Sequence, residues 1–131
     1  MFKSIVTIAA FLSLNVAVAA ETVIQHAEAT KHYGHKMTVE GTVVATSCDG
    51  KKCYLNFNQD FRKALSVIIE TADIAKFTKA TTTAAQQADM DTLYKGKKVH
   101  VTGVISEYKS KSTNTSRPQM SLSGPADIKV K

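Results

Sequence analysis

Two similar stretches of sequence indicate the fold: Gly34-His-Lys-Met-Thr-Val-Glu-Gly-Thr-Val43 and Gly96-Lys-Lys-Val-His-Val-Thr-Gly-Val-Ile105. They are an internal repeat with the shared pattern G-x-K-[MV]-x-V-x-G-x-[VI]. In both copies apolar and polar residues alternate, which is the period of a β-strand with one buried face. Each copy also carries a glycine in mid-strand, where a strand bends sharply or another group comes close. Two bent strands predict a small closed barrel. The residues expected on its inner face are Val39, Gly41, Val43, Val99, Val101, Gly103 and Ile105.

Residues 1–20 have the composition of a secretory signal peptide. Lys3 supplies a positive charge, the segment from Ile5 to Val18 is mostly apolar, and Ala17-Val-Ala-Ala20 provides the small residues that a signal peptidase requires. We therefore expect cleavage before Glu21 and a periplasmic or secreted protein.

The mature chain is expected to be basic and to form one domain. Removing the signal peptide takes away Lys3 and no acidic residue, so 16 Lys and Arg remain against 11 Asp and Glu, a net charge of +5. About 110 residues are enough to bury a single core. No later segment is apolar enough to span a membrane. A basic exported protein attracts polyanions such as nucleic acid or anionic envelope polymers.

The two cysteines predict a disulfide. Cys48 and Cys53 flank Asp49-Gly-Lys-Lys52, and Asp-Gly between two strand-like runs is typical of a hairpin turn. The cysteines should therefore face each other across a hairpin. In an oxidising compartment this arrangement favours a disulfide, whereas a metal or redox pair would favour C-x-x-C spacing.

Three strands are expected before a helical region and two after it. Between Asp73 and Tyr94 the composition favours one or two helices, broken near Thr81-Thr-Thr83 and ended before Gly96. A polar, basic loop is expected over residues 109–117. The expected strands span residues 37–47, 54–58, 65–71, about 96–108, and 119–122 with 128–130, the last being interrupted at Gly124-Pro125.

Three strands, a helix and two more strands, with bends in the first and fourth strands, is the order of the OB fold. The sequence thus predicts an all-β fold with an inserted helix, a five-stranded OB-fold Greek-key barrel with the helix between strands 3 and 4. This domain would cover residues 34–131. It would be preceded by a lead-in over residues 21–33 and by the signal peptide.

The two glycine-containing stretches, together with Tyr54-Leu-Asn-Phe-Asn58, Val67-Ile-Ile69 and Gly124-Pro-Ala-Asp-Ile-Lys-Val130, resemble the small exported bacterial OB-fold proteins. Those proteins are grouped with nucleic-acid-binding OB domains, and their barrel is similar to that of staphylococcal-type nucleases. The resemblance covers about residues 34–130 and implies the fold. It fixes no ligand, because the matching residues are mostly the glycines and apolar positions that build the barrel.

OB domains bind ligands on the outer face of strands 2 and 3, between the loop joining strands 1 and 2 and the loop joining strands 4 and 5. Lysines in those loops would attract a phosphate backbone, and Tyr54 or Phe61 would stack on a base. Single-stranded nucleic acid or another polyanion is therefore the expected partner, with no cofactor. The candidate ligand-binding residues are Lys51, Lys52, Tyr54, Asn56, Phe61, Arg62, Lys109, Lys111 and Arg117.

Two other partner classes stay open. The lysine-rich loops are also compatible with an ordinary solubilising surface on an envelope protein-interaction module, and only 7% of the residues are aromatic, with no Trp to stack on bases. A metal-binding OB protein would use His32 and His35, with His26 and Met37 nearby. One observation counts against a metal site. His35 occupies the same position in the first repeat as Lys97 in the second, so it is expected to be an ordinary exposed residue where a strand begins.

An enzyme is not expected. Nuclease chemistry needs carboxylates that hold a cation and arginines that neutralise the developing charge. The chain has only Arg62 and Arg117, and Asp60 has no second carboxylate placed beside it. The patterns G-x-S-x-G and H-E-x-x-H are absent, and a disulfide would leave no nucleophilic cysteine. A noncatalytic binding module is the expectation.

Overall fold

A computed structural model of the chain describes residues 22–131, so the signal peptide expected at residues 1–20 lies outside the described residues. None of the helices within residues 22–131 is long and apolar enough to cross a membrane. The described residues form nine strands, one α-helix and four short 3-10 helices. The strands are β1 (Val23–Gln25), β2 (Lys36–Thr42), β3 (Ala45–Cys48), β4 (Cys53–Asn56), β5 (Ser66–Ile69), β6 (Lys98–Val104), β7 (Ser106–Lys109), β8 (Ser116–Leu122) and β9 (Ile128–Val130). The helices are η2 (His26–Lys31), η3 (Phe61–Lys63), η4 (Thr71–Lys76), α1 (Thr83–Tyr94) and η5 (Pro125–Asp127).

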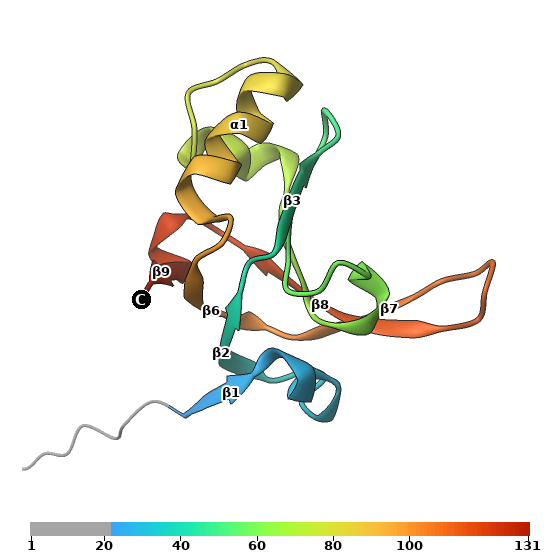
Figure 1. Cartoon of the computed structure of the whole chain (residues 1–131). Helices are drawn as coiled ribbons and strands as arrows, with labels where there is room; N and C mark the ends of the chain where they lie inside the picture. The colour runs from blue at the N-terminus through green and yellow to red at the C-terminus, as the bar shows by residue number, and fades with distance from the viewer. Residues whose placement is uncertain (1–21) are drawn as a thin grey trace, which may run out of the picture.

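The strands form two sheets, one with the order β1-β2-β6-β9 and one with the order β3-β4-β5-β8-β7 (Figure 1). β1 pairs with β2 in parallel and β5 pairs with β8 in parallel, whereas the other pairs are antiparallel. Taking β2 with β3 and β6 with β7 as two bent strands gives the strand and helix order of the OB fold. The predicted all-β OB-like fold, with a helix between the third and fourth strands, is confirmed.

The two glycine-containing strands are interrupted rather than continuous. The strand predicted over residues 37–47 is β2 followed by β3, and that predicted over 96–108 is β6 followed by β7. At the interruptions the Val43 N–H donates to the Lys97 carbonyl oxygen and the Ile105 N–H donates to the His35 carbonyl oxygen, each at 3.0 Å. Each bend carries the chain from one sheet to the other. The expected closed barrel is therefore corrected to two sheets that share a core.

The apolar residues expected inside lie in one core. Val39, Val43, Val99, Val101 and Ile105 are fully buried. They belong to the same cluster as Leu55, Phe57, Val67 and Ile69.

The mid-strand glycines are explained by close approach of a core side chain. A Cβ atom on Gly41 would lie 2.7 Å from Phe57 Cδ1, and one on Gly103 would lie 2.8 Å from Met120 Cγ. Both positions are thus closed to larger residues unless the neighbour moves. Gly34 and Gly96, which open the two repeats, have φ of 85° and 81°, a region that favours glycine.

The predicted hairpin disulfide is confirmed, because Cys48 and Cys53 are bonded at the paired ends of β3 and β4. The turn between them depends on Asp49, whose Oδ1 accepts hydrogen bonds from the backbone N–H groups of Lys51 and Lys52 at 2.9 and 2.8 Å. Gly50 supplies the positive φ of 90° that the turn requires.

Both ends of the described chain differ from expectation. The lead-in forms β1 and η2, and β1 joins the first sheet by pairing Ile24 with Val39. At the other end, β9 pairs with β6 and does not continue the strand that ends at Leu122. The turn after Leu122 includes η5, where the Asp127 carboxylate accepts a hydrogen bond from the Ser123 N–H at 2.8 Å. This turn redirects the chain to the other sheet.

The helix α1 packs on the outer edge of β3 (Figure 1). It begins after Thr82, whose hydroxyl accepts a hydrogen bond from the Ala85 N–H, so the predicted break near residues 81–83 is confirmed. Met90 and Tyr94 are buried, whereas Leu93 is 39% exposed. Gln87 bonds the free backbone edge of β3: its Oε1 accepts from the Cys48 N–H at 2.8 Å and its Nε2 donates to the Thr46 carbonyl at 3.0 Å.

Candidate functional site

The outward surface of the five-stranded sheet, which we call the groove face, is built by strand alternation. Leu55 of β4, Val67 of β5 and Met120 of β8 are aligned and point into the core. Their neighbours along each strand must therefore point outward. The outward residues are Ser47 from β3, Tyr54 and Asn56 from β4, Ser66 and Ile68 from β5, Arg117, Gln119 and Ser121 from β8, and Ser106 and Tyr108 from β7.

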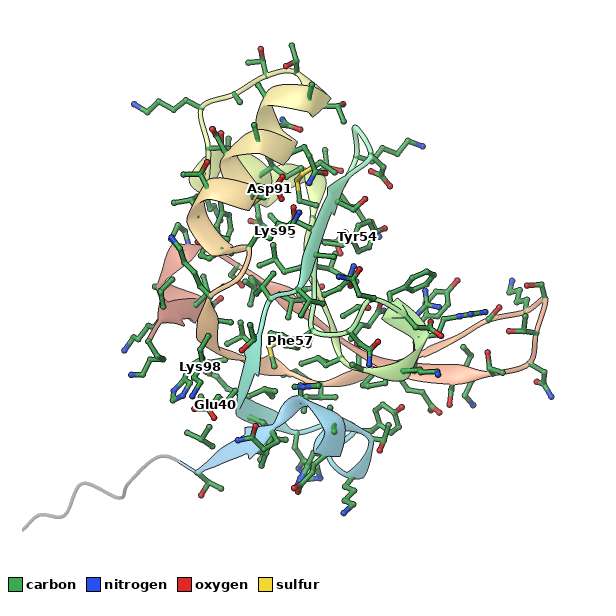
Figure 2. All side chains as sticks on the ribbon, viewed as in Figure 1. Glu40, Tyr54, Phe57, Asp91, Lys95 and Lys98 are labelled. Atoms are coloured by element: carbon green, nitrogen blue, oxygen red, sulfur yellow. A yellow bond between two sulfur atoms is a disulfide. The ribbon has the colours of Figure 1, made fainter. Side chains whose placement is uncertain are left out.

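The groove face contains an open cavity of about 310 Å³. Figure 2 shows Tyr54 on the side of the β3 strand away from Asp91 of α1, so the helix leaves this side of the sheet uncovered. Ile68 is only 4% exposed even though it points outward, because its neighbours on the groove face surround it. The lining residues are Ser47, Tyr54, Asn56, Phe61, Ser66, Ile68, Arg117 and Gln119.

Phe61 reaches the cavity from η3, the short helix between β4 and β5. Asp60 caps this helix by accepting a hydrogen bond from the Arg62 N–H at 3.1 Å, and the Arg62 guanidinium donates back to the Asp60 carboxylate at 3.0 Å. The pKa of Asp60 is lowered, first by the side-chain hydrogen bond from Arg62. Phe61 itself is 46% exposed, which is unusual for a ring that size and leaves it free to contact a ligand.

Arg117 is held by two aromatic rings. Its Cζ lies 4.8 Å from the centre of the Phe61 ring and 4.5 Å from the centre of the Tyr108 ring. Each such cation–π contact contributes about 0.5–1 kcal/mol at an exposed site and leaves the N–H groups of the guanidinium able to bond elsewhere. The guanidinium is thus positioned in the wall of the cavity without an ion-pair partner within residues 22–131.

Two polar atoms of the cavity residues are buried without a hydrogen-bond partner, Asn56 Oδ1 and Arg117 Nε. Leaving a buried donor or acceptor unpaired costs about 1–3 kcal/mol, so such atoms are uncommon in folded proteins. Here an unpaired acceptor and an unpaired donor occur in residues that line one cavity.

The structure brings together four of the nine predicted ligand-binding residues at the cavity, namely Tyr54, Asn56, Phe61 and Arg117. Arg117 lies in β8 and not in the loop where it was expected. The other basic residues stand outside the cavity lining. Lys52 pairs with Glu70 at 3.4 Å and Arg62 pairs with Asp60.

The remaining three lysines are exposed. Lys51 is in the turn between β3 and β4, and Lys111 is in the turn between β7 and β8. Lys109 pairs with Ser116, next to the pair of Tyr108 with Arg117, so alternation directs its side chain to the opposite face of β7.

The residues of the groove face that the sequence prediction did not include comprise Ser47, Tyr108 and Gln119. Gln119 is next to the buried Met120, so counting alternation back from Met120 and Leu122 would have placed it and Arg117 outward. For Tyr108 no such signal exists, because all four residues of β7 are exposed.

The histidines do not gather into a metal site within the described residues, where no group of three His, Cys, Asp or Glu side chains could hold an ion. The His26 ring packs against Phe57 at 5.3 Å between ring centres, and burial lowers its pKa. On the first sheet, His100 Nε2 lies 2.8 Å from the Glu40 carboxylate. The pKa of Glu40 is lowered by the hydrogen bond from Gln25 and then by that with His100.

Comparison with known proteins supports the fold. No protein-family model and no curated protein matches the chain. Solved structures do match, and one of them is the Entamoeba histolytica aspartyl-tRNA synthetase, with a TM-score of 0.54 and 12% identity over 84% of this chain and 21% of the synthetase. The asparaginyl-tRNA synthetase of the same organism matches with a TM-score of 0.52 and 13% identity over 83% of this chain and 23% of the synthetase. The OBody AM1L10 bound to hen egg-white lysozyme also matches, with a TM-score of 0.50 and 16% identity over 88% of this chain and 97% of the OBody. The chain spans about a fifth of the length of the synthetases, and at such identities the likeness shows the fold alone.

Proposed function

We propose that this protein is a noncatalytic OB-type module that binds single-stranded nucleic acid on the groove face. The observation that carries the proposal is the cavity itself, where the rings of Tyr54 and Phe61 and the unpaired Arg117 meet. Aromatic rings stack on bases, and a fixed guanidinium bonds to oxygen acceptors of bases or phosphates. An unstacked base of a single strand can enter a cavity of this kind, whereas the bases of a duplex remain stacked.

Charge supports the same partner. Without residues 1–20 the chain has a net charge of +5, and exposed lysines stand at both ends of the groove face, Lys51 in one turn and Lys111 in the other. They are placed to attract the phosphate backbone on either side of the cavity. None of the residues that line the cavity is acidic, which supports a binding role over metal-assisted hydrolysis.

The structural neighbours are compatible with two partner classes. Two of them are aminoacyl-tRNA synthetases, enzymes named for their action on tRNA, and a third is bound to the protein lysozyme. Protein binding is therefore the second candidate function. The aromatic rings and the fixed guanidinium at the cavity favour nucleic acid, because the rings can stack on a base and the guanidinium can bond to oxygen atoms of a base or a phosphate.

Export is part of the proposal. The signal peptide composition of residues 1–20 and the bonded Cys48–Cys53 pair both support it, since disulfides persist mainly outside the cytosol. We therefore place the binding activity in the periplasm or outside the cell.

The test is titration of a labelled single-stranded oligonucleotide with purified protein at about physiological salt. Phe61→Ala should weaken binding by about 5-fold or more, because base–aromatic stacking contributes about 1–3 kcal/mol per base. Leu93→Ala is the matched control, since Leu93 is a similarly exposed apolar residue on α1, outside the groove face. It should bind like the parent. Raising the salt should weaken parent binding with a logarithmic slope of about −0.7 for each phosphate contacted.

Absence of binding at tens of micromolar protein, roughly where even nonspecific contacts register, would reject nucleic acid as the partner. Protein binding would then be the better account. Equal loss of affinity in Phe61→Ala and Leu93→Ala would reject the groove face as the binding surface.

A further inference from the structure

One edge of the five-stranded sheet is open. Within residues 22–131, β7 pairs only with β8, and all four of its residues are exposed. At the opposite edge of the sheet, Gln87 of α1 bonds to the backbone of β3 and covers it. Figure 1 shows the hairpin of β7 and β8 projecting from the rest of the molecule. An exposed strand edge of this kind is a template for pairing with another strand.

The backbone of β7 directs the polar groups of two residues to the open edge. In an antiparallel ladder, alternate residues bond to the neighbouring strand and the others direct N–H and C=O away from it. The Ser110 N–H donates to the Thr115 carbonyl oxygen at 2.8 Å, so every second residue counted back from Ser110 bonds to β8. Glu107 is not in that set, and it stands opposite Pro118, which has no N–H to donate. The N–H and C=O groups of Glu107 and Lys109 therefore point to the open edge.

We infer that β7 is the contact surface for a second copy of this chain, whose own β7 pairs with it antiparallel. A symmetric pair of β7 strands could bring the outward groups together with Glu107 facing Glu107, with Lys109 facing Lys109, or with Glu107 facing Lys109. The first two registers place like charges directly opposite each other, which is destabilising. The third register places opposite charges together, and it alone uses both outward residues of each β7.

In that register the contact is self-complementary, as an interface between identical chains must be. Glu107 of each copy meets Lys109 of the other, with the backbones of each pair exchanging both N–H···O bonds and the side chains lying on one face of the shared sheet. Neither side chain has an ion-pair partner in its own chain within residues 22–131. On the other face, the two Tyr108 side chains meet at the two-fold axis.

The pairing would join the groove faces of the two copies. Directly opposite residues of neighbouring strands lie on the same face of a sheet, so both groove faces would lie on the same side of one continuous sheet. Arg117, which contacts Tyr108 in each copy, would stand on either side of the axis. Under the proposed function, one nucleic acid strand could lie across both groove faces. The pairing itself requires no ligand.

The experiment is sedimentation equilibrium of the purified protein without ligand, from about 10 μM to about 1 mM, the range suited to a small interface. The parent should form a reversible dimer. Glu107→Lys and Lys109→Glu should each weaken dimerisation by about 10-fold or more, because symmetry places like charges opposite each other at both ends of the contact. The double variant with both changes restores opposite charges, and its dimerisation should be within about 3-fold of the parent.

Lys111→Glu is the matched control. It makes the same change of charge as Lys109→Glu, but Lys111 is an exposed residue of the turn beyond β7. This variant should dimerise like the parent. Circular dichroism confirms that each variant is folded.

Tyr108→Cys tests the register. In the inferred register the two Cα atoms at this position face each other in a non-hydrogen-bonded pair about 4.5 Å apart, a separation that a disulfide can span. Mild oxidation should therefore give a covalent dimer of Tyr108→Cys on a non-reducing gel. Ser112→Cys, at an exposed turn residue, controls for random collision and should give much less.

A protein that stays monomeric over the whole concentration range overturns the inference. A dimer that survives both single charge reversals also overturns it, because the contact would then lie elsewhere. If folded single variants lose the dimer and the double variant does not regain it, the assigned pairing of Glu107 with Lys109 is wrong. Equal cross-linking of Tyr108→Cys and Ser112→Cys likewise rejects the register. None of these measurements involves an oligonucleotide, so the proposed function is tested separately.

Discussion

Gly41 and Gly103 occupy equivalent positions in the two repeats, but they contact different neighbours. A Cβ on Gly41 would lie 2.7 and 2.9 Å from two atoms of the Phe57 ring and 3.0 Å from His26 Cδ2. On Gly103 it would lie 2.8 and 3.1 Å from Cγ and Sδ of Met120. A buried aromatic ring cannot easily move aside, whereas a methionine adapts through three rotatable bonds.

We expect Gly41→Ala to lower the free energy of unfolding by about 1–3 kcal/mol, the usual cost of overpacking a core. Gly103→Ala should cost less than about 1 kcal/mol, because Met120 can adopt another rotamer. Chemical denaturation of the two variants beside the parent measures both values. A larger loss for Gly103→Ala than for Gly41→Ala would show that the ring of Phe57 is the more mobile of the two neighbours.

Asn56 and Asn58 offer a second contrast. Asn56 Oδ1 is buried without a partner, whereas Asn58 Oδ1 accepts a hydrogen bond from the Asp60 N–H at 2.9 Å. Asn56→Val should therefore raise the free energy of unfolding by about 1 kcal/mol, since it removes an unsatisfied acceptor. Asn58→Ala should lower it by about 0.5–1.5 kcal/mol through loss of one hydrogen bond. Thermal denaturation without ligand tests both signs, and destabilisation by Asn56→Val would mean that its amide is satisfied in solution.

At the scale of elements, the β3–β4 hairpin has a pH dependence of definite sign. The pKa of Asp49 is lowered from 3.8, chiefly by hydrogen bonds from the backbone of Lys52 and then of Lys51. The folded state therefore favours the charged carboxylate. Its stabilising effect is fully present well above pH 3.8 and is lost as the pH falls through the lower pKa of the folded state.

Asp49→Ala should lower the melting temperature at about pH 7, and its difference from the parent should shrink as the pH falls below about 4. Asp49→Asn is the control, because an amide oxygen still accepts the backbone hydrogen bonds but does not titrate. The difference in melting temperature between Asp49→Asn and the parent should also shrink in acid. The difference that remains should be smaller than the one that remains for Asp49→Ala. Melting curves between about pH 7 and pH 2 give the comparison, and a constant Asp49→Ala difference over that range would contradict the role of the charge.

Elements with a buried face could be predicted from the sequence, and elements without one could not. Val39 and Val101 alternate with polar neighbours, and their strands form as expected. β7 has no buried residue, so its pattern does not reveal where the strand ends and the loop begins. β8 begins with two polar residues, Ser116 and Arg117, which look like a continuation of the preceding loop. For this reason the sequence placed Arg117 in the loop.

At the scale of the whole molecule, the candidate site was predictable in part. Tyr54 and Asn56 follow from alternation around Leu55, and the strand order indicates which sheet face to examine. The contact of Arg117 with Phe61 and Tyr108 was not predictable, since it joins η3, β7 and β8 through tertiary packing alone. The unpaired atoms could not be predicted either, because hydrogen-bond satisfaction depends on every neighbour in space.

The pairing of β5 with β8 and of β2 with β6 has a consequence for how the chain acquires its shape. Val67 lies beside Met120, and Val39 lies beside Val101, so each sheet joins segments that are far apart in the sequence. During synthesis, the amino-terminal half emerges first, with its apolar strand faces uncovered. Such distant pairings form late and slowly. Throughout that interval the growing polypeptide would be a substrate for chaperones and proteases, and the groove face would not yet exist.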